Sequence, residues 1–385
     1  GLNIRDAEIE FNDQSTGDHY RLSDFFMKTG PIGDGRPLPF ELSALFEDMA
    51  AGSVTDVTFA ATATLNLEQE RYAFEQAELS LNPWQADGDS GAAAIRIESP
   101  RMLADMAAQT LDMEEFSLNL ASLSASGNLS AKQIVDKPAF QGSVTIREFS
   151  PRGLMRELNM EPIATTDADA LGRVTVQATF TGDSTSLHLP DLDMNLDQSR
   201  INGDVKVRNF NQPRIGFTLN VDQIDIDRYL APSEPGSSSD EVAIPREELR
   251  GQEVEGKLNI GLLHMAGMEL TDVMLGISIR GGSLRLNPLT AGFYGGKYNG
   301  DITVDSSGDV PEISIDETID SVAFQRLLGD LVDGKSLSGL AQGRLKLNGR
   351  GNNSNEVLGS LNGELGLNLS DGALEGINIW HEIRK

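Results

Sequence analysis

The chain has 385 residues, no cysteine and a formal net charge of -28. The lack of cysteine excludes disulfides, thiolate catalysis and cysteine-based metal sites. The negative charge repels phosphate backbones, and no stripe of lysine and arginine interleaved with aromatic residues interrupts it, so we expect no nucleic-acid partner.

Valine, isoleucine, leucine and threonine dominate the patterned stretches, which favours strands joined by tight turns over an all-helical protein. No run approaches the roughly 18 apolar residues of a membrane-spanning helix, and Gly1 does not open a signal peptide. The chain lacks an initiator methionine and stops at Lys385 in what resembles the start of a helix. We therefore expect an excised fragment whose targeting and anchoring segments lie outside this sequence.

Apolar and polar residues alternate with a period of two along most of the chain. Because successive side chains of a strand point to opposite faces, each such segment predicts a strand with one apolar and one wet face, as in antiparallel sheets. The segments include 65–67, 79–81, 116–120, 174–176, 192–196, 205–207, 258–260, 284–286, 302–304, 345–347 and 367–369.

Five dipeptides predict two-residue hairpin turns, because Asn-Gly and Asp-Gly adopt the positive backbone angles that these turns need. Consecutive strands are therefore predicted to be hairpin neighbours in a long meander. The dipeptides are Asp87-Gly88, Asn202-Gly203, Asn299-Gly300, Asn362-Gly363 and Asp371-Gly372.

A unit made of a proline, an alternating strand, a helix cap and one turn of helix recurs at Pro138, Pro213 and Pro311, with a fainter copy at Ile95. A repeated unit cannot close a core alone and must stack on its neighbours. Ser99 and Ser150, each followed by proline, are suited to cap short helices. The helices are predicted near 101–109, 151–158, 226–230 and 321–332.

Two motifs match known binding loops only formally. Gly329–Ser336 fits the phosphate-binding pattern, but a predicted helix precedes it and a predicted strand follows, so it is interpreted as a connector. Asp191–Asp197 resembles the opening of a calcium loop, but Leu196 occupies its glycine position, and its alternation favours a strand.

The residues indicate no catalytic centre. The four histidines, at 19, 188, 264 and 381, are far apart, and no nucleophile elbow or carboxylate pair stands out. We therefore expect neither an enzyme nor a metal or cofactor site.

The C-terminal half resembles the AsmA family of bacterial envelope proteins. The resemblance is densest in 244–250, 255–263 and 282–296, and it continues through 369–377. Upstream, 149–154 and 225–230 follow the same style, so it covers about residues 140 to 385.

This resemblance implies a protein held in the inner membrane by an N-terminal helix, with a periplasmic β-body whose curved sheet encloses an apolar groove that carries phospholipids. The expected fold is mostly β: a long antiparallel, curved and twisted sheet of the repeating β-groove type, with a few short helices at repeat boundaries. The expected segments are an N-terminal β-groove segment (1–135), a middle β repeat ending in a short helix (136–230), a flexible linker (231–245) and an AsmA-like β segment (246–385).

A sheet with a single apolar face must cover that face with another sheet, with helices, or with something that is not protein. The predicted helices are too short and too few, whereas acyl chains could cover it at roughly 0.8 kcal/mol per buried CH₂. Two sheets closing on each other as a dry sandwich remain an alternative. The candidate groove residues, each of which could equally be an ordinary core residue, are Phe217, Leu219, Val221, Ile302, Val304, Ile313, Ile315, Leu345 and Leu347.

The leading hypothesis is a periplasmic module that binds or conducts phospholipids, or another acyl-chain ligand, along the groove between inner and outer membranes. Its expected partners are the inner membrane, through a segment absent from this chain, and the outer membrane. One alternative is a structural or assembly factor for outer-membrane proteins, whose sheet edge accepts a client strand. Another is an enzyme acting on an envelope glycan, which the even spread of Asp and Glu disfavours.

Overall fold

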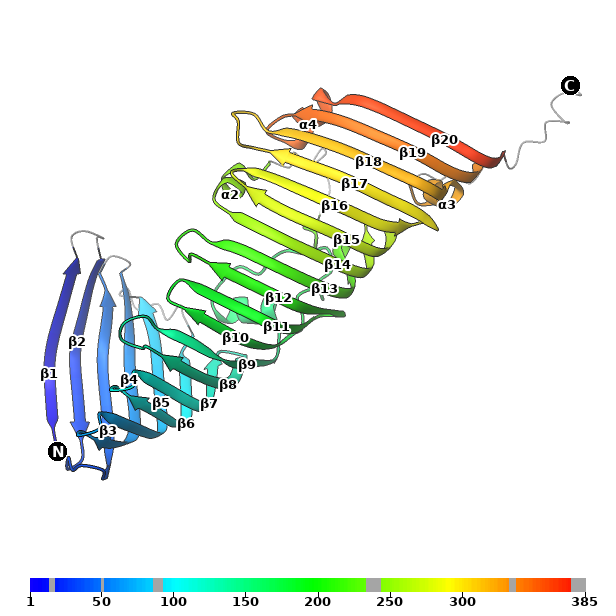
Figure 1. The fold of residues 1–385 in the computed structure, drawn as a ribbon. Coiled ribbons are helices and arrows are strands. Elements are labelled where there is room, and N and C mark those ends of the chain that lie inside the picture. The colour runs from blue at the N-terminus through cyan, green and yellow to red at the C-terminus, as the bar shows by residue number, and fades with distance from the viewer. Residues whose placement is uncertain (14–17, 50–51, 86–92, 233–243, 332–336, 375–385) are drawn as a thin grey trace, which may run out of the picture. The chain divides into compact units, whose positions relative to one another are not determined.

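The computed structural model describes residues 1–13, 18–49, 52–85, 93–232, 244–331 and 337–374. The chain divides into two compact units: unit 1 comprises residues 1–163 and 171–197, and unit 2 comprises residues 164–170 and 198–385. Both are built almost entirely from strands with a few short helices (Figure 1), which confirms the predicted fold class.

Unit 1 is an antiparallel sheet in which each strand pairs with the next along the chain. Its one helix in the described residues is α1 (Pro151–Glu157), between β9 and β10. The strands are β1 (Asn3–Asp13), β2 (Asp18–Thr29), β3 (Pro37–Asp48), β4 (Ser53–Asn66), β5 (Arg71–Gln85), β6 (Ile95–Asp105), β7 (Thr110–Leu120), β8 (Leu123–Lys132), β9 (Ala139–Phe149), β10 (Val174–Asp183) and β11 (Ser186–Leu196).

Unit 2 continues the same pattern with nine strands that lie side by side in Figure 1. They are β12 (Ser199–Arg208), β13 (Arg214–Asp225), β14 (Glu253–Met265), β15 (Met268–Arg280), β16 (Ser283–Phe293), β17 (Gly296–Asp305), β18 (Glu312–Ala323), β19 (Leu337–Arg350) and β20 (Asn362–Leu374). Its helices are η1 (Ile226–Tyr229), α2 (Arg246–Arg250), α3 (Phe324–Leu331) and α4 (Ser354–Ser360).

One strand pair departs from the predicted meander. β13 and β14 run parallel, with Arg214 opposite Glu253 and Asp225 opposite His264. Parallel neighbours need a connection of a dozen or more residues, which 226–252 provide with η1 and α2 at its ends. Most of the predicted linker, 233–243, lies outside the described residues.

The prediction of Asn-Gly and Asp-Gly hairpin turns was wrong. Asn202-Gly203, Asn299-Gly300, Asn362-Gly363 and Asp371-Gly372 all lie inside strands, and Asp87-Gly88 falls outside the described residues. Glycine serves close backbone approach there instead: a Cβ on Gly363 would lie 1.9 Å from the backbone oxygen of Lys346.

The turns that do join strands in unit 2 use other residues. Ala266-Gly267, Gly281-Gly282 and Tyr294-Gly295 each have positive φ at both positions, the conformation of the favoured two-residue hairpin turn. Gly281-Gly282 is itself a turn signal, whereas in the other two pairs only the glycine was a usable signal, because alanine and tyrosine rarely adopt this conformation.

Three of the four predicted helices exist, and the one near 101–109 was wrong. Ser150 caps α1 by accepting a hydrogen bond from the Gly153 amide, with Pro151 at the first position, as predicted. Ser99 lies instead within β6, buried, with its hydroxyl 3.0 and 2.8 Å from the backbone oxygens of Arg101 and Glu115. Because the Ser99 hydroxyl bonds to the neighbouring strand β7, it stabilises the irregular stretch between these two strands and does not cap a helix. α2 and α4 were not predicted.

Register shifts recur in both units. Two of those in unit 2 fall beside Asp272 in β15 and Ser321 in β18, whose φ values are 49 and 57 degrees. Such bulges bend a strand and increase its twist, so they give the sheet the curvature that the fold class predicted.

Candidate functional site

The strand register of unit 2 places apolar side chains on one continuous face, here called the unit-2 apolar face. Residues opposite each other in a ladder share a face, so the alternation can be followed from strand to strand. Phe217 lies opposite Val205, Ile302 lies opposite Leu286 and Ile315, and Ile315 lies opposite Leu347. The face includes, from β12 to β20, Ile201, Val205, Val207, Ile215, Phe217, Leu219, Val221, Val254, Leu258, Ile260, Leu263, Leu270, Val273, Leu275, Ile277, Ile279, Leu284, Leu286, Leu289, Ala291, Phe293, Tyr298, Ile302, Val304, Ile313, Ile315, Glu317, Ile319, Val322, Ala341, Leu345, Leu347, Leu365, Leu367 and Leu369, with glycines between them.

All nine candidate groove residues lie on this face. Val221 is buried at 8% exposure, and the other eight are half-buried. The structure therefore brings the nine together, while their contact with an acyl chain stays a prediction.

The opposite face of the same strands is polar. Arg285 pairs with Asp301 at 2.5 Å, and its hydrogen bond lowers the pKa of that carboxyl below its usual value. Asn259 donates to Asn220, which donates to Asn202, forming an amide ladder across three strands. Side chains of this kind are stable in contact with water, so this face needs no apolar cover.

No second sheet covers the unit-2 apolar face in the described part of the chain. Each strand makes its main contacts with its ladder neighbours, and the main contacts of the helices are with β14, β15, β16, β18 and β19. Toward β20 the face is openly solvated, with Leu365 74% and Leu367 52% exposed. Large leucines are seldom left this exposed in a row, so the face is a surface on which an apolar ligand would lose contact with water.

Unit 1 has an apolar face of the same kind. Phe40, Phe59 and Phe74 come from three adjacent strands and pack edge to face with ring centroids 5.9 to 6.5 Å apart. Phe11 and Tyr20 extend the aromatic surface toward β1. None of these aromatic residues was predicted from sequence, since the nine candidate groove residues all lie between 217 and 347.

A single acidic side chain, Glu317, stands among the face positions given above. Tyr298 hydrogen-bonds to it, and burial together with the nearby carboxylate raises the pKa of the Tyr298 hydroxyl. Gly300 is the ladder partner of Glu317, and the Tyr298 hydroxyl occupies the place where a Cβ of Gly300 would stand. The Glu317 carboxylate therefore has a hydrogen-bond partner, the Tyr298 hydroxyl, on an otherwise apolar face.

A pocket of about 800 Å³, here called the Phe293 pocket, is lined by residues from the adjoining ends of β15, β16 and β17 and by residues of α3. None of its charged residues was among the candidates predicted from sequence. Arg326 and Glu269 line it together with Phe293, and their signal in the sequence was only that of ordinary surface charges. The other lining residues are Thr271, Gly292, Tyr294, Gly295, Gly296, Gln325 and Gly329.

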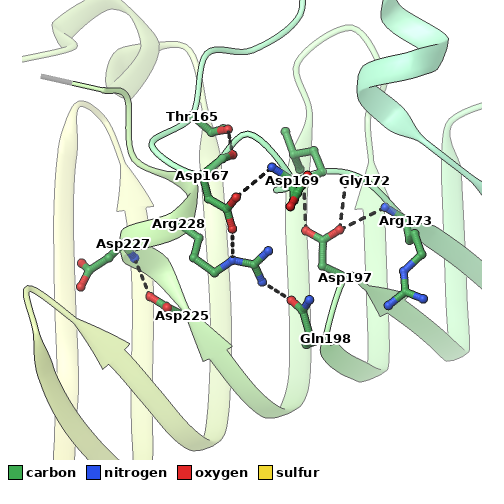
Figure 2. A network of polar contacts seen from close by, with 11 residues as sticks. Thr165, Asp167, Asp169, Gly172, Arg173, Asp197, Gln198, Asp225, Asp227 and Arg228 are labelled. Carbon is green, nitrogen blue, oxygen red and sulfur yellow. Dashed lines mark hydrogen bonds and ion pairs between the residues drawn. The ribbon is translucent and has the colours of Figure 1, made fainter. Parts of the chain in front are cut away.

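Two polar clusters hold the loop between α1 and β10 (Figure 2). In unit 2, Arg228 donates through Nε to Asp167 at 2.6 Å and through Nη1 to Gln198. In unit 1, the Asp197 carboxylate accepts hydrogen bonds from the backbone amides of Leu171, Gly172 and Arg173 at 2.9 to 3.0 Å. These charged groups are engaged in hydrogen bonds with the loop and its neighbours, so we interpret the two clusters as loop anchors and not as reactive groups.

Replacing Arg228 with alanine is expected to lower the free energy of unfolding of unit 2 by about 1–3 kcal/mol, because it removes a charged hydrogen bond that is only 21% exposed on the arginine side. Denaturant unfolding followed by circular dichroism measures this. The control is Arg214→Ala, whose ion pair with Glu253 is mostly exposed and should contribute less than about 1 kcal/mol. Equal losses in the two variants would contradict the anchoring role.

The two formal motifs take the positions expected of ordinary structure. Asp191 to Leu196 belong to β11, and Asp197 is the loop anchor. Gly329 to Leu331 end α3, which precedes β19, while 332–336 lie outside the described residues. Among the described residues, no three His, Asp or Glu side chains are grouped so that they could hold a metal ion, and no helix has the length and apolar character needed to cross a membrane.

Comparison with known proteins gave one finding. The model of the AsmA family matches residues 1–385, the full length of the chain, and extends the resemblance seen in the C-terminal half. Neither the curated proteins nor the solved structures gave a match. With its whole length matched and its sheets as expected, this chain belongs to the AsmA family.

Proposed function

We propose that this chain is a periplasmic module of an inner-membrane-anchored protein, and that it binds or conducts phospholipids along its apolar faces between the inner and outer membranes. The observation that carries the proposal is the unit-2 apolar face: thirty-odd alternating positions on nine strands, backed by a polar face and left without a covering sheet in the described residues. Family membership agrees with a role in the bacterial envelope.

The energetics favour a mobile lipid. Each CH₂ removed from water contributes roughly 0.8 kcal/mol, so a single acyl chain along several strands gains several kcal/mol. Contacts of this kind have no preferred direction along the face. A chain can therefore move from one set of leucines and isoleucines to the next without breaking hydrogen bonds.

Chemical extraction tests the proposal. The purified protein is extracted with organic solvent and the extract is quantified by mass spectrometry against protein amount. We expect phospholipid at near-stoichiometric or higher amounts, because the exposed leucines need a cover. A folded protein that yields no phospholipid would contradict the proposal.

One observation favours a second candidate, a structural or assembly factor for outer-membrane proteins. Within the described residues β20 pairs only with β19, and its Leu365 and Leu367 are among the most exposed large apolar side chains. An unpaired edge of this kind can accept an added strand. Protein without lipid in the extraction, together with a client segment cross-linked to β20, would favour this role. We further propose that the chain has no enzymatic activity.

A further inference from the structure

The Phe293 pocket joins an apolar floor to two opposite charges. Phe293 follows Leu289 and Ala291 on the same side of β16, so it belongs to the unit-2 apolar face, and it is 9% exposed. Its ladder partner in β15 is Leu270, also buried. Glu269, Thr271 and Gly292 alternate with Leu270 and Phe293, so they line the pocket from the other side of the sheet. The pocket therefore lies at the strand ends, where a ligand whose apolar part lies on the face beside Phe293 can place its polar end.

The two charges at the pocket come from different elements. Glu269 stands at the start of β15 and Arg326 lies on α3. Neither side chain has an ion-pair or hydrogen-bond partner in the described part of the chain, and they do not pair with each other. An unpaired guanidinium and an unpaired carboxylate at one opening form a site for a dipolar ligand.

The chemistry of each charge defines that ligand. A guanidinium is suited to hydrogen-bond phosphate oxygens, and a carboxylate accepts from an ammonium group. The chain's net charge of -28 repels a ligand with net negative charge. A zwitterion, whose phosphate meets Arg326 while its ammonium meets Glu269, avoids that repulsion.

We propose that the Phe293 pocket binds the headgroup of an amine-bearing zwitterionic phospholipid, with Arg326 at the phosphate, Glu269 at the ammonium and the acyl chains on the unit-2 apolar face. This inference rests on the proposed lipid-binding function and adds headgroup selection to it. The headgroup then lies at the end of the strands, where it stays hydrated and does not have to be desolvated. The acyl tails lie on the leucines and isoleucines of the unit-2 apolar face.

A competition between two lipids tests the assignment. Protein stripped of lipid is incubated with vesicles of equimolar phosphatidylethanolamine and phosphatidylglycerol, purified again and extracted. The wild-type protein should retain about threefold more of the ethanolamine lipid, the size expected of one partly exposed charge contact. Glu269→Gln should bring the ratio to about one without lowering total bound lipid, and Arg326→Gln should lower retention of both lipids.

The matched control is Glu255→Gln, a carboxylate on the polar face of β14 that does not line the pocket. It should keep the wild-type ratio. Lipid bound by wild type in a ratio of one, or an unchanged ratio in Glu269→Gln, would overturn the headgroup assignment and leave the proposed function standing. Wild-type protein that binds neither lipid would overturn both.

A soluble competitor separates a lipid from a free headgroup. Glycerophosphoethanolamine carries the same charges without acyl chains, so it should not displace the lipid at the same concentration. Full displacement would assign the pocket to a soluble phosphodiester and overturn the lipid assignment.

Discussion

Replacing Ile315 with aspartate is expected to lower the phospholipid recovered with the purified protein by at least about tenfold. Ile315 lies at the middle of the unit-2 apolar face, between Ile302 and Leu347 on the neighbouring strands. A carboxylate there would have to lose its water to each passing acyl chain, which costs several kcal/mol. Solvent extraction followed by mass spectrometry measures the loss.

The control is Ser314→Asp, one residue away on the same strand. Ser314 lies opposite Thr303 and Asn348 on the polar face, so the same charge enters the same strand on the side that faces water. It should leave lipid recovery unchanged. Phe217→Asp and Thr218→Asp form a second such pair on β13. Normal recovery from a folded Ile315→Asp protein would remove this face from the lipid path.

Replacing Gly142 with alanine is expected to destabilise unit 1 by about 2–3 kcal/mol. A Cβ at Gly142 would lie 2.1 Å from the backbone oxygen of Asn128 and 2.7 Å from the ring of Phe180, its ladder partner. The arrangement is reciprocal, because the ring of Phe140 lies over Gly182 in the same way. The oxygen belongs to the backbone, so relief requires the strands to separate.

Thermal or denaturant unfolding of the wild-type and Gly142→Ala proteins measures this loss of stability. Gly366→Ala is the matched control, since a Cβ at Gly366 would meet nothing within 4 Å. It should change stability by less than about 1 kcal/mol. A Gly142→Ala protein as stable as the control would mean that the strands can separate at no cost.

The faces of the strands were predictable from sequence, whereas their connections were not. Alternation at Phe217, Ile302 and Leu345 gave the correct side because the side-chain period of a strand is two. Turn prediction failed because Asn-Gly is also suited to strands that approach closely, as Gly363 shows. The parallel β13 and β14 were missed because the intervening segment carries no period from which a direction could be inferred.

The Phe293 pocket could not be found from sequence for a different reason. Glu269, Phe293 and Arg326 are separated by tens of residues, and they come together only because the start of β15, the end of β16 and α3 line one pocket. A lone arginine on a short helix carries no signal of its partners. The Ser99-Pro100 pair shows the reverse case, a clear local helix signal that the ladder overrode.

The unit-2 apolar face consists of many interchangeable aliphatic residues, so no single residue provides most of its apolar surface. Exchanging one leucine for valine removes a single methylene from a surface spanning nine strands, and exchanging it for methionine nearly conserves the volume. Such a protein can diverge widely in sequence and keep its physical role. Selection needs to preserve only the alternation of apolar and polar residues and the few glycines at which neighbouring backbones approach closely. Homology between distant members would then be detectable from the alternation of apolar and polar residues even where little sequence identity is left.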